Sequence, residues 1–187
     1  MHLQKGKNKM TNFMIAQLIA VVICVVACGS YFAKKKSIYL FLQLIVNILY
    51  GTQYLLLGQL AGTVSNAVSS TKYVYFIYKE KVKKENTKTE LLVFLALSVM
   101  LGVLAIDSWF SVIPIVTSLL FTYAIWQKSE ITLRAIVIFC NLLWVVFNLC
   151  AGAYVSALYS FAEMAFATIT MIKLIKLRRS QDAKDSN

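Results

Sequence analysis

The chain has 187 residues, of which 59% are hydrophobic and 14% are charged, and its mean hydropathy is +0.70. Because about a quarter of the residues of a soluble domain are charged, these values exclude a water-soluble globular protein and predict an all-α, polytopic membrane protein. Lys and Arg number 19 against 8 Asp and Glu, which gives a net charge of +11 whose location decides its meaning.

Uncharged apolar runs predict seven membrane-spanning helices. A span needs about 20 mainly apolar residues, so the runs 37–71 and 135–162 are each too long for one crossing. Turn signals at 58–62 and 151–153 divide them into helical hairpins. The predicted helices are 12–33, 37–57, 60–79, 91–106, 109–127, 133–151 and 154–174.

These helices divide the chain into five parts. A basic leader (1–9) precedes a first three-helix unit (10–79). A basic loop with a linker helix (80–106) connects it to a second three-helix unit (107–174), and a basic tail (175–187) follows.

The positive charges lie on alternate connections, which seven spans place on one side of the membrane. The opposite connections carry no basic residue, so the positive-inside rule predicts a cytoplasmic C-terminus and an external N-terminus. The charge excess is then an orientation signal that attracts anionic lipid headgroups, and no binding of nucleic acid is expected. The basic residues of that side are Lys34, Lys35, Lys36, Lys79, Lys81, Lys83, Lys84, Lys88, Lys128, Arg134, Lys173, Lys176, Arg178, Arg179 and Lys184.

The leader conflicts with this topology, because Lys5, Lys7 and Lys9 would lie outside. A start at Met10 would remove all three lysines and also His2, the single histidine of the chain. We therefore hypothesise that the leader is an untranslated or dispensable extension.

Since the helices contain no histidine, we expect neither an enzyme nor a metal or cofactor site.

The two three-helix units align with each other at a shift of 94 residues, without a gap. Chance alignment of apolar helices is the alternative explanation. A repeat would give a 3+1+3 arrangement whose units have the same orientation about an axis along the membrane normal. The aligned pairs include Asn47 with Asn141, Tyr50 with Trp144, Leu55 with Leu149, Gly58 with Gly152, and Lys79 with Lys173.

The chain resembles the YgjV family of bacterial inner-membrane proteins, within the wider clan of SWEET, PQ-loop and PnuC-like transporters. The resemblance is carried by the opening 10–17, the turn 32–37, the stretch 47–62 and the pair Asn66-Ala67. It implies a SWEET-like bundle in the bacterial inner membrane and solute transport. The hinge prolines of better-known members are missing from helix one, and Pro114 in helix five is the remaining candidate hinge.

Two ionisable residues lie inside predicted spans, where each costs at least about 2.5 kcal/mol at the helix centre. Glu163 lies ten residues before Lys173, which is roughly 15 Å at 1.5 Å per residue and therefore close to the bilayer midplane. Lys72 lies seven residues before Lys79 and either snorkels to the surface or pairs with Glu163. Glu163 is alternatively a proton-coupling carboxylate.

Neutral polar and aromatic residues of the spans form the predicted solute site. The family resemblance assigns a substrate-contacting asparagine to helix three, where Asn66 fits, and places Ser160 at the corresponding position of helix seven. The alternative is that such residues only connect helices by hydrogen bonds. The candidate binding residues are Asn47, Tyr50, Asn66, Asn141, Trp144 and Ser160.

Two functions remain open. The first is a carrier of a small polar solute that works by alternating access between the three-helix halves. The second is a membrane adaptor or sensor that acts through its basic loop and tail. Neither the solute, the coupling ion nor the formation of a homo-oligomer can be deduced from the sequence.

Overall fold

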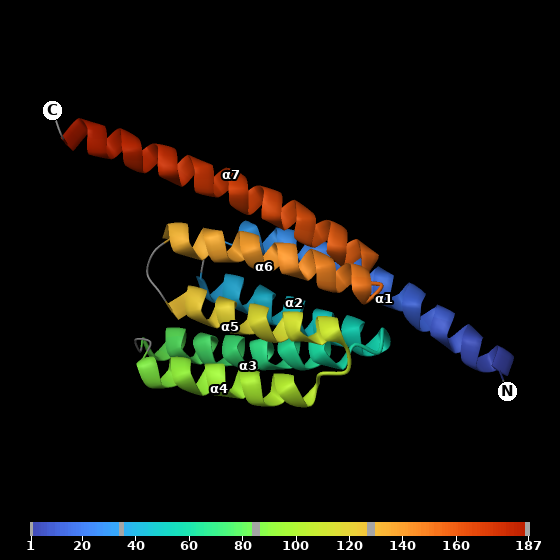
Figure 1. Ribbon diagram of the computed structural model, residues 1–187. Coiled ribbons are helices and arrows are strands. Elements are labelled where there is room, and N and C mark those ends of the chain that lie inside the picture. Colours follow the sequence, from blue (N-terminus) through green and yellow to red (C-terminus); the bar gives the residue numbers. More distant parts are fainter. Residues whose placement is uncertain (1, 34–35, 84–86, 127–129, 186–187) are drawn as a thin grey trace.

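The computed structural model describes residues 2–33, 36–83, 87–126 and 130–185, and within these ranges it is entirely helical, with no strand. The predicted all-helical fold is confirmed, and each predicted helix overlaps one observed α-helix (Figure 1). The elements are α1 (His2–Tyr31), α2 (Lys36–Leu56), α3 (Leu60–Val82), α4 (Lys88–Leu104), the 3-10 turn η1 (Trp109–Ser111), α5 (Val112–Trp126), α6 (Glu130–Cys150) and α7 (Tyr154–Asp185).

The first and last helices are longer than predicted. α1 begins at His2 and so includes the basic leader, and α7 continues through most of the predicted tail to Asp185. Lys, Arg, Gln and Ala in the tail are good helix formers, and no proline ends the helix there. Both helices extend beyond the bundle at opposite ends, where the two termini lie (Figure 1).

Four helices of the described chain are long and apolar enough to cross a membrane. Their apolar segments are Lys9–Ser30, Ser37–Leu56, Ile131–Cys150 and Tyr154–Lys176. Of the others, α4 has 17 residues and α5 has 15, while α3 contains lysines. The crossing of the membrane by these three helices stays a prediction.

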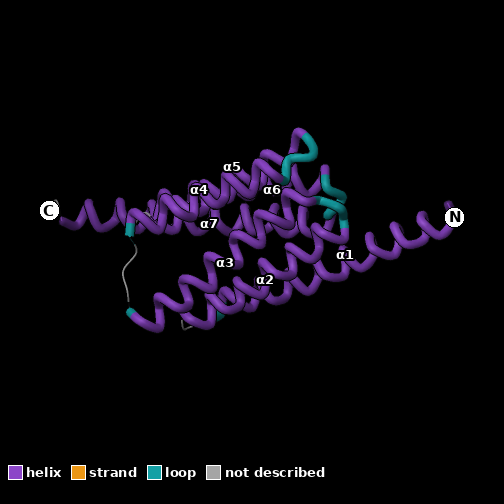
Figure 2. Tube along the Cα trace, turned by 90° about the horizontal axis from the view of Figure 1, so that it is seen from below, coloured by secondary structure: helices purple, strands orange, loops and turns teal. Residues whose placement is uncertain are grey.

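Each helix packs against its neighbours in sequence. Two further contacts are those of α1 with α7, which connects the beginning and the end of the chain, and of α3 with α5. In Figure 2, α2 and α3 diverge from α5, α6 and α7 toward the end of the bundle that has the C-terminus. We call this end the basic end, because it carries Lys79, Lys81, Lys83 and Lys88. The opposite end, with the turns at 57–59, 105–108 and 151–153, is the turn end.

Two hairpin turns at the turn end have the same geometry. Gly58 and Gly152 have φ angles of 73° and 74°, a left-handed conformation that glycine adopts without steric cost. The amide after each glycine donates to a carbonyl five residues earlier, Gln59 to Tyr54 and Ala153 to Asn148, both at 2.8 Å. Each turn is therefore a Schellman motif that ends one helix and begins the next.

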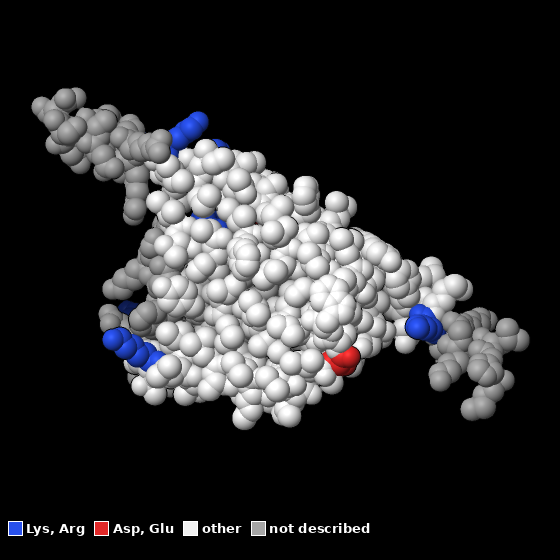
Figure 3. Space-filling model, viewed as in Figure 1, with Lys and Arg blue, Asp and Glu red and all other residues white. Residues whose placement is uncertain are grey.

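The outside of the bundle is apolar and the inside is partly polar. Large apolar side chains such as Leu18, Val25, Leu158 and Phe166 are exposed, whereas Gln53, Asn148 and Ser156 are almost fully buried. On the face shown in Figure 3, uncharged residues cover the middle and charged side chains lie near the ends. This distribution is the reverse of that of a soluble protein and fits a bundle surrounded by lipid.

Candidate functional site

A buried hydrogen-bond network connects α2 with α6 and α7 near the turn end. The Tyr54 hydroxyl donates to Asn148 Oδ1 at 2.7 Å, and Asn148 Nδ2 donates to Ser160 Oγ at 3.3 Å. Ser156 Oγ donates to Gln53 Oε1 at 2.9 Å. We call these five residues the polar network. Since α2 belongs to the first predicted unit and α6 and α7 to the second, the network joins the two units.

Aromatic rings surround this network. Tyr50 and Trp144 both stack on the ring of Tyr54, each with a centroid distance of 5.9 Å. Phe147 contacts Tyr54 edge to face at 5.3 Å. The backbone of Gly62 approaches so closely that an added Cβ would lie 2.8 Å from the Tyr54 ring. The structure thus brings together the predicted pair Tyr50 and Trp144, with Tyr54 between them.

The predicted asparagines behave differently from one another. Asn47 Nδ2 donates to Gln43 O, and Asn66 Nδ2 donates to Gly62 O, both at 2.8 Å and both within their own helix. Asn141 is 3% exposed, and its Nδ2 has no hydrogen-bond partner among the described residues. A buried donor without a partner costs about 1–3 kcal/mol, so Asn141 is the asparagine most in need of a ligand.

Gln53 is a second orphan donor. Its Oε1 accepts the Ser156 hydrogen bond, but its Nε2 has no partner within the described chain, although the residue is 0% exposed. Gln53 and Asn141 therefore present two amide groups to the interior of the bundle.

Glu163 faces the same interior from α7. The residue is half-buried, and its charge interacts with the hydroxyl groups of Tyr39 and Tyr50 on α2 and of Tyr73 on α3. Ser160, which accepts from Asn148, lies one turn closer to the turn end on the same helix. Polar groups thus continue along α7 from the polar network to Glu163.

Lys72 does not form the predicted pair with Glu163. Lys72 is 5% exposed, and its ammonium donates to two hydroxyls of α5, Thr122 Oγ1 at 2.9 Å and Ser118 Oγ at 3.3 Å. The reason is the rotation of α3: Ser65, seven residues earlier on the same face, also contacts α5 through the carbonyl oxygen of Pro114 at 3.2 Å. Lys72 neither pairs with Glu163 nor snorkels to the basic end, so both readings are corrected.

Pro114, the candidate hinge, is fully buried and is the third residue of α5. The amides of the first helical turn have no partner within the helix, so proline removes no hydrogen bond there. Its position favours a role in beginning α5.

The basic end contains a fixed ion pair where α3 approaches the start of α4. Lys79 Nζ and Tyr75 Oη each donate to Glu90 at 2.6 Å, and Thr87 and Glu90 form a capping box. Desolvation disfavours the Glu90 carboxylate, but hydrogen bonds from Lys79, Tyr75 and the Thr87 amide, with the charge of Lys79, outweigh it and lower its pKa to about 2.

Sequence reasoning missed Gln53, Tyr54 and Asn148, three of the five residues of the polar network. A signal was present, because Tyr54 and Asn148 are 94 residues apart and so occupy matching positions of the predicted repeat. Gln17 was also missed: its side chain donates to Gly152 O at 2.8 Å and accepts from Val155 N at 3.2 Å, at the start of α7.

Apolar helices of membrane-spanning length around buried amides and hydroxyls define a multi-pass helical membrane protein. Comparison with protein families identifies it further, because the model of the Imp-YgjV family, described as a bacterial inner membrane protein, matches residues 14–181. The chain belongs to this family, as its sequence predicted, and is an integral protein of the bacterial inner membrane. It matches no curated protein and no solved structure.

Proposed function

We propose that the protein carries a small polar solute across the inner membrane by alternating access between the units α1–α3 and α5–α7. The observation that carries this proposal is the polar network at the boundary of the units, together with the buried amide donors of Gln53 and Asn141, which have no partner among the described residues. A protein that only anchored a partner to the membrane would gain nothing from buried donors without partners.

Three features support a repeat with two equivalent halves. The Schellman turns of Gly58 and Gly152 are 94 residues apart, as are the bonded residues Tyr54 and Asn148. Exchanging the halves also converts the contact of α1 with α7 into that of α5 with α3, and both contacts are present. A carrier built from such halves can rock them against each other about a central site.

The solute would bind between the polar network and Glu163. In this proposal Asn47, Asn66, Asn141 and Ser160 offer hydrogen bonds, and Tyr50 and Trp144 offer aromatic faces. For Asn141 the hydrogen-bond donor has no partner among the described residues, whereas Asn66 would first exchange its bond to Gly62. Glu163 would exchange the coupling proton.

The turn end would be the closed gate of the conformation described here. Bonds of Gln17, Gln53 and Tyr54 to the second unit all lie there, while the helix axes diverge toward the basic end (Figure 2). With the basic end in the cytoplasm, next to anionic lipid headgroups, this conformation faces inward.

A thermal-shift screen of purified protein with sugars, nucleosides, vitamins and amino acids tests the site. We expect one class to stabilise the wild type but not Asn141→Ala, with Thr71→Ala, an exposed site on α3, as the control that keeps the response. The absence of any stabilising compound for folded protein would refute the carrier.

Uptake of the stabilising compound into proteoliposomes tests the coupling. Glu163→Gln should abolish uptake driven by a pH gradient, because the amide carries no exchangeable charge, and Glu80→Gln on the exposed part of α3 should not. Unchanged pH-driven uptake by Glu163→Gln would remove this residue from the mechanism.

A further inference from the structure

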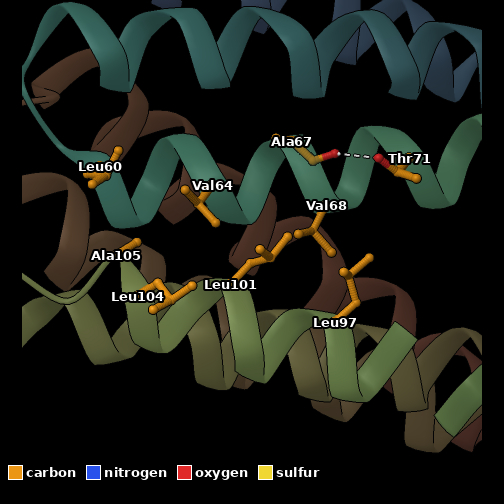
Figure 4. Close-up of a pocket in the computed structure, with 9 residues that line it drawn as sticks. All are labelled: Leu60, Val64, Ala67, Val68, Thr71, Leu97, Leu101, Leu104 and Ala105. Atoms are coloured by element: carbon orange, nitrogen blue, oxygen red, sulfur yellow. Dashed lines mark hydrogen bonds between the residues drawn. The ribbon is translucent and has the colours of Figure 1, made fainter. Parts of the chain in front are cut away.

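An apolar groove lies between α3 and α4, away from the polar network. It has a volume of about 370 Å³ and runs from Leu60 to Thr71 on α3 and from Leu97 on α4 to Ala105, the residue after that helix (Figure 4). Thr71 is its one polar lining residue, and its hydroxyl donates to Ala67 O at 3.1 Å within α3. The walls of the groove therefore offer contacts to an apolar chain and no hydrogen-bond donor.

Beside the groove, α4 fits closely against α5. A Cβ added to Gly102 would lie 2.7 Å from Cγ1 of Ile115, and Ser118 Oγ donates to Ser98 Oγ at 3.1 Å. These contacts hold α4 on α5 beside the groove.

A buried lysine, Lys72, begins next to one end of the groove. Figure 4 shows Thr71 and Leu97 together at that end, and Lys72 and Ser98 follow them directly in the chain. Consecutive Cα atoms are about 3.8 Å apart, so the lysine and the serine begin at the border of the groove.

The Lys72 ammonium has hydroxyl groups as its partners and, within the described chain, no carboxylate. It has three N–H donors, of which two bind Ser118 and Thr122. Thr122 and Ser98 direct their own hydroxyl protons to backbone carbonyls, Ser118 O and Phe94 O. A cation buried this deeply in a membrane protein is expensive without an anion, and one donor remains for it.

We propose that this groove binds a single-chain amphiphile with a carboxylate head, of the fatty-acid class. The acyl chain would lie along α3 from Thr71 to Leu60, roughly 16 Å at 1.5 Å per residue, and the carboxylate would accept a hydrogen bond from Lys72. A single negative charge matches the single ammonium, and the bilayer supplies such compounds directly to a groove that faces lipid. The site is separate from the proposed solute pathway and goes beyond it.

Native mass spectrometry of the full chain, released from detergent micelles, tests the proposal with hexadecanoate and hexadecan-1-ol as probes. The two have the same chain and differ in head charge. We expect hexadecanoate to bind at least about tenfold more tightly, as a charge-assisted hydrogen bond implies. Lys72→Met should remove this preference, and Lys81→Met, at an exposed position of α3, should retain it.

A second variant tests the groove itself with Lys72 intact. Leu101→Trp fills the groove and should weaken both probes at least about tenfold, with folding checked by thermal unfolding of each variant. Equal affinity of the wild type for the two probes would overturn the proposal. So would undiminished hexadecanoate binding by either Lys72→Met or Leu101→Trp.

Discussion

Replacing Tyr54 by phenylalanine removes one oxygen atom from the centre of the polar network and leaves the ring stack in place. Tyr54 and Asn148 are each 1% exposed, and the Tyr54 hydroxyl is the only hydrogen-bond partner of Asn148 Oδ1 in the described chain. Interhelical hydrogen bonds in membrane proteins contribute about 0.6 kcal/mol on average and about 1.7 at most. Because Tyr54→Phe leaves a buried acceptor without a partner, we expect a loss of about 1–2 kcal/mol.

The measurement is equilibrium unfolding in mixed micelles of mild detergent and dodecyl sulfate. The fluorescence of the three tryptophans reports unfolding, and one of them, Trp144, stacks on Tyr54. Tyr78→Phe is the matched control, since Tyr78 is 55% exposed, and it should change the free energy of unfolding by less than about 0.5 kcal/mol.

A double-mutant cycle with Asn148→Leu completes the test. Removing both partners takes away the orphaned acceptor, so the combined loss should be smaller than the sum of the single losses. Additive losses, or a loss for Tyr54→Phe no larger than that for Tyr78→Phe, would refute the reasoning.

Three further variants test other parts of the fold by thermal unfolding. Gly62→Ala should lose about 1–3 kcal/mol, because its Cβ would lie 2.8 Å from the buried Tyr54 ring; wild-type stability would contradict that packing. Gly152→Ala should lose about 1–2 kcal/mol, because its φ is +74°, whereas Gly29→Ala, with no atom within 4 Å of the added Cβ, should lose nothing. The stability that Glu90 contributes should be complete above its ordinary pKa of 4.5 and should disappear as the pH falls toward about 2, its pKa in the fold. Glu90→Gln should remove this acid dependence. If the variant and the wild type lose stability in acid to the same extent, the ion pair contributes nothing.

The sequence was sufficient for those features that a single helix determines by itself. Apolar runs located the helices, and Gly58 and Gly152 located the turns, because length, hydropathy and a positive φ are local properties. The ends of α1 and α7 were predicted too short, because charged residues end a membrane span without ending a helix.

The partners of buried side chains were less predictable, because they depend on the rotation of each helix about its axis. Lys72 was expected to meet Glu163, but α3 turns this side chain toward Ser118 and Thr122 of α5. Tyr54 and Asn148 occupy matching positions at the 94-residue shift. Residue identity alone does not reveal this pair, because one residue is a tyrosine and the other is an asparagine.

The close fit of Gly102 against Ile115 has a consequence for how the protein moves. In the proposed carrier, a linker helix that fits closely against α5 would travel with the second half, so the two bodies would contain three and four helices. In that proposal α3 would move against α4 and α5. Contacts of Ser65, Lys72 and Lys79 cross this boundary. In the proposed carrier, a disulfide introduced between α4 and α5 would join parts of one body, whereas one between α3 and α4 would join the two bodies and stop transport.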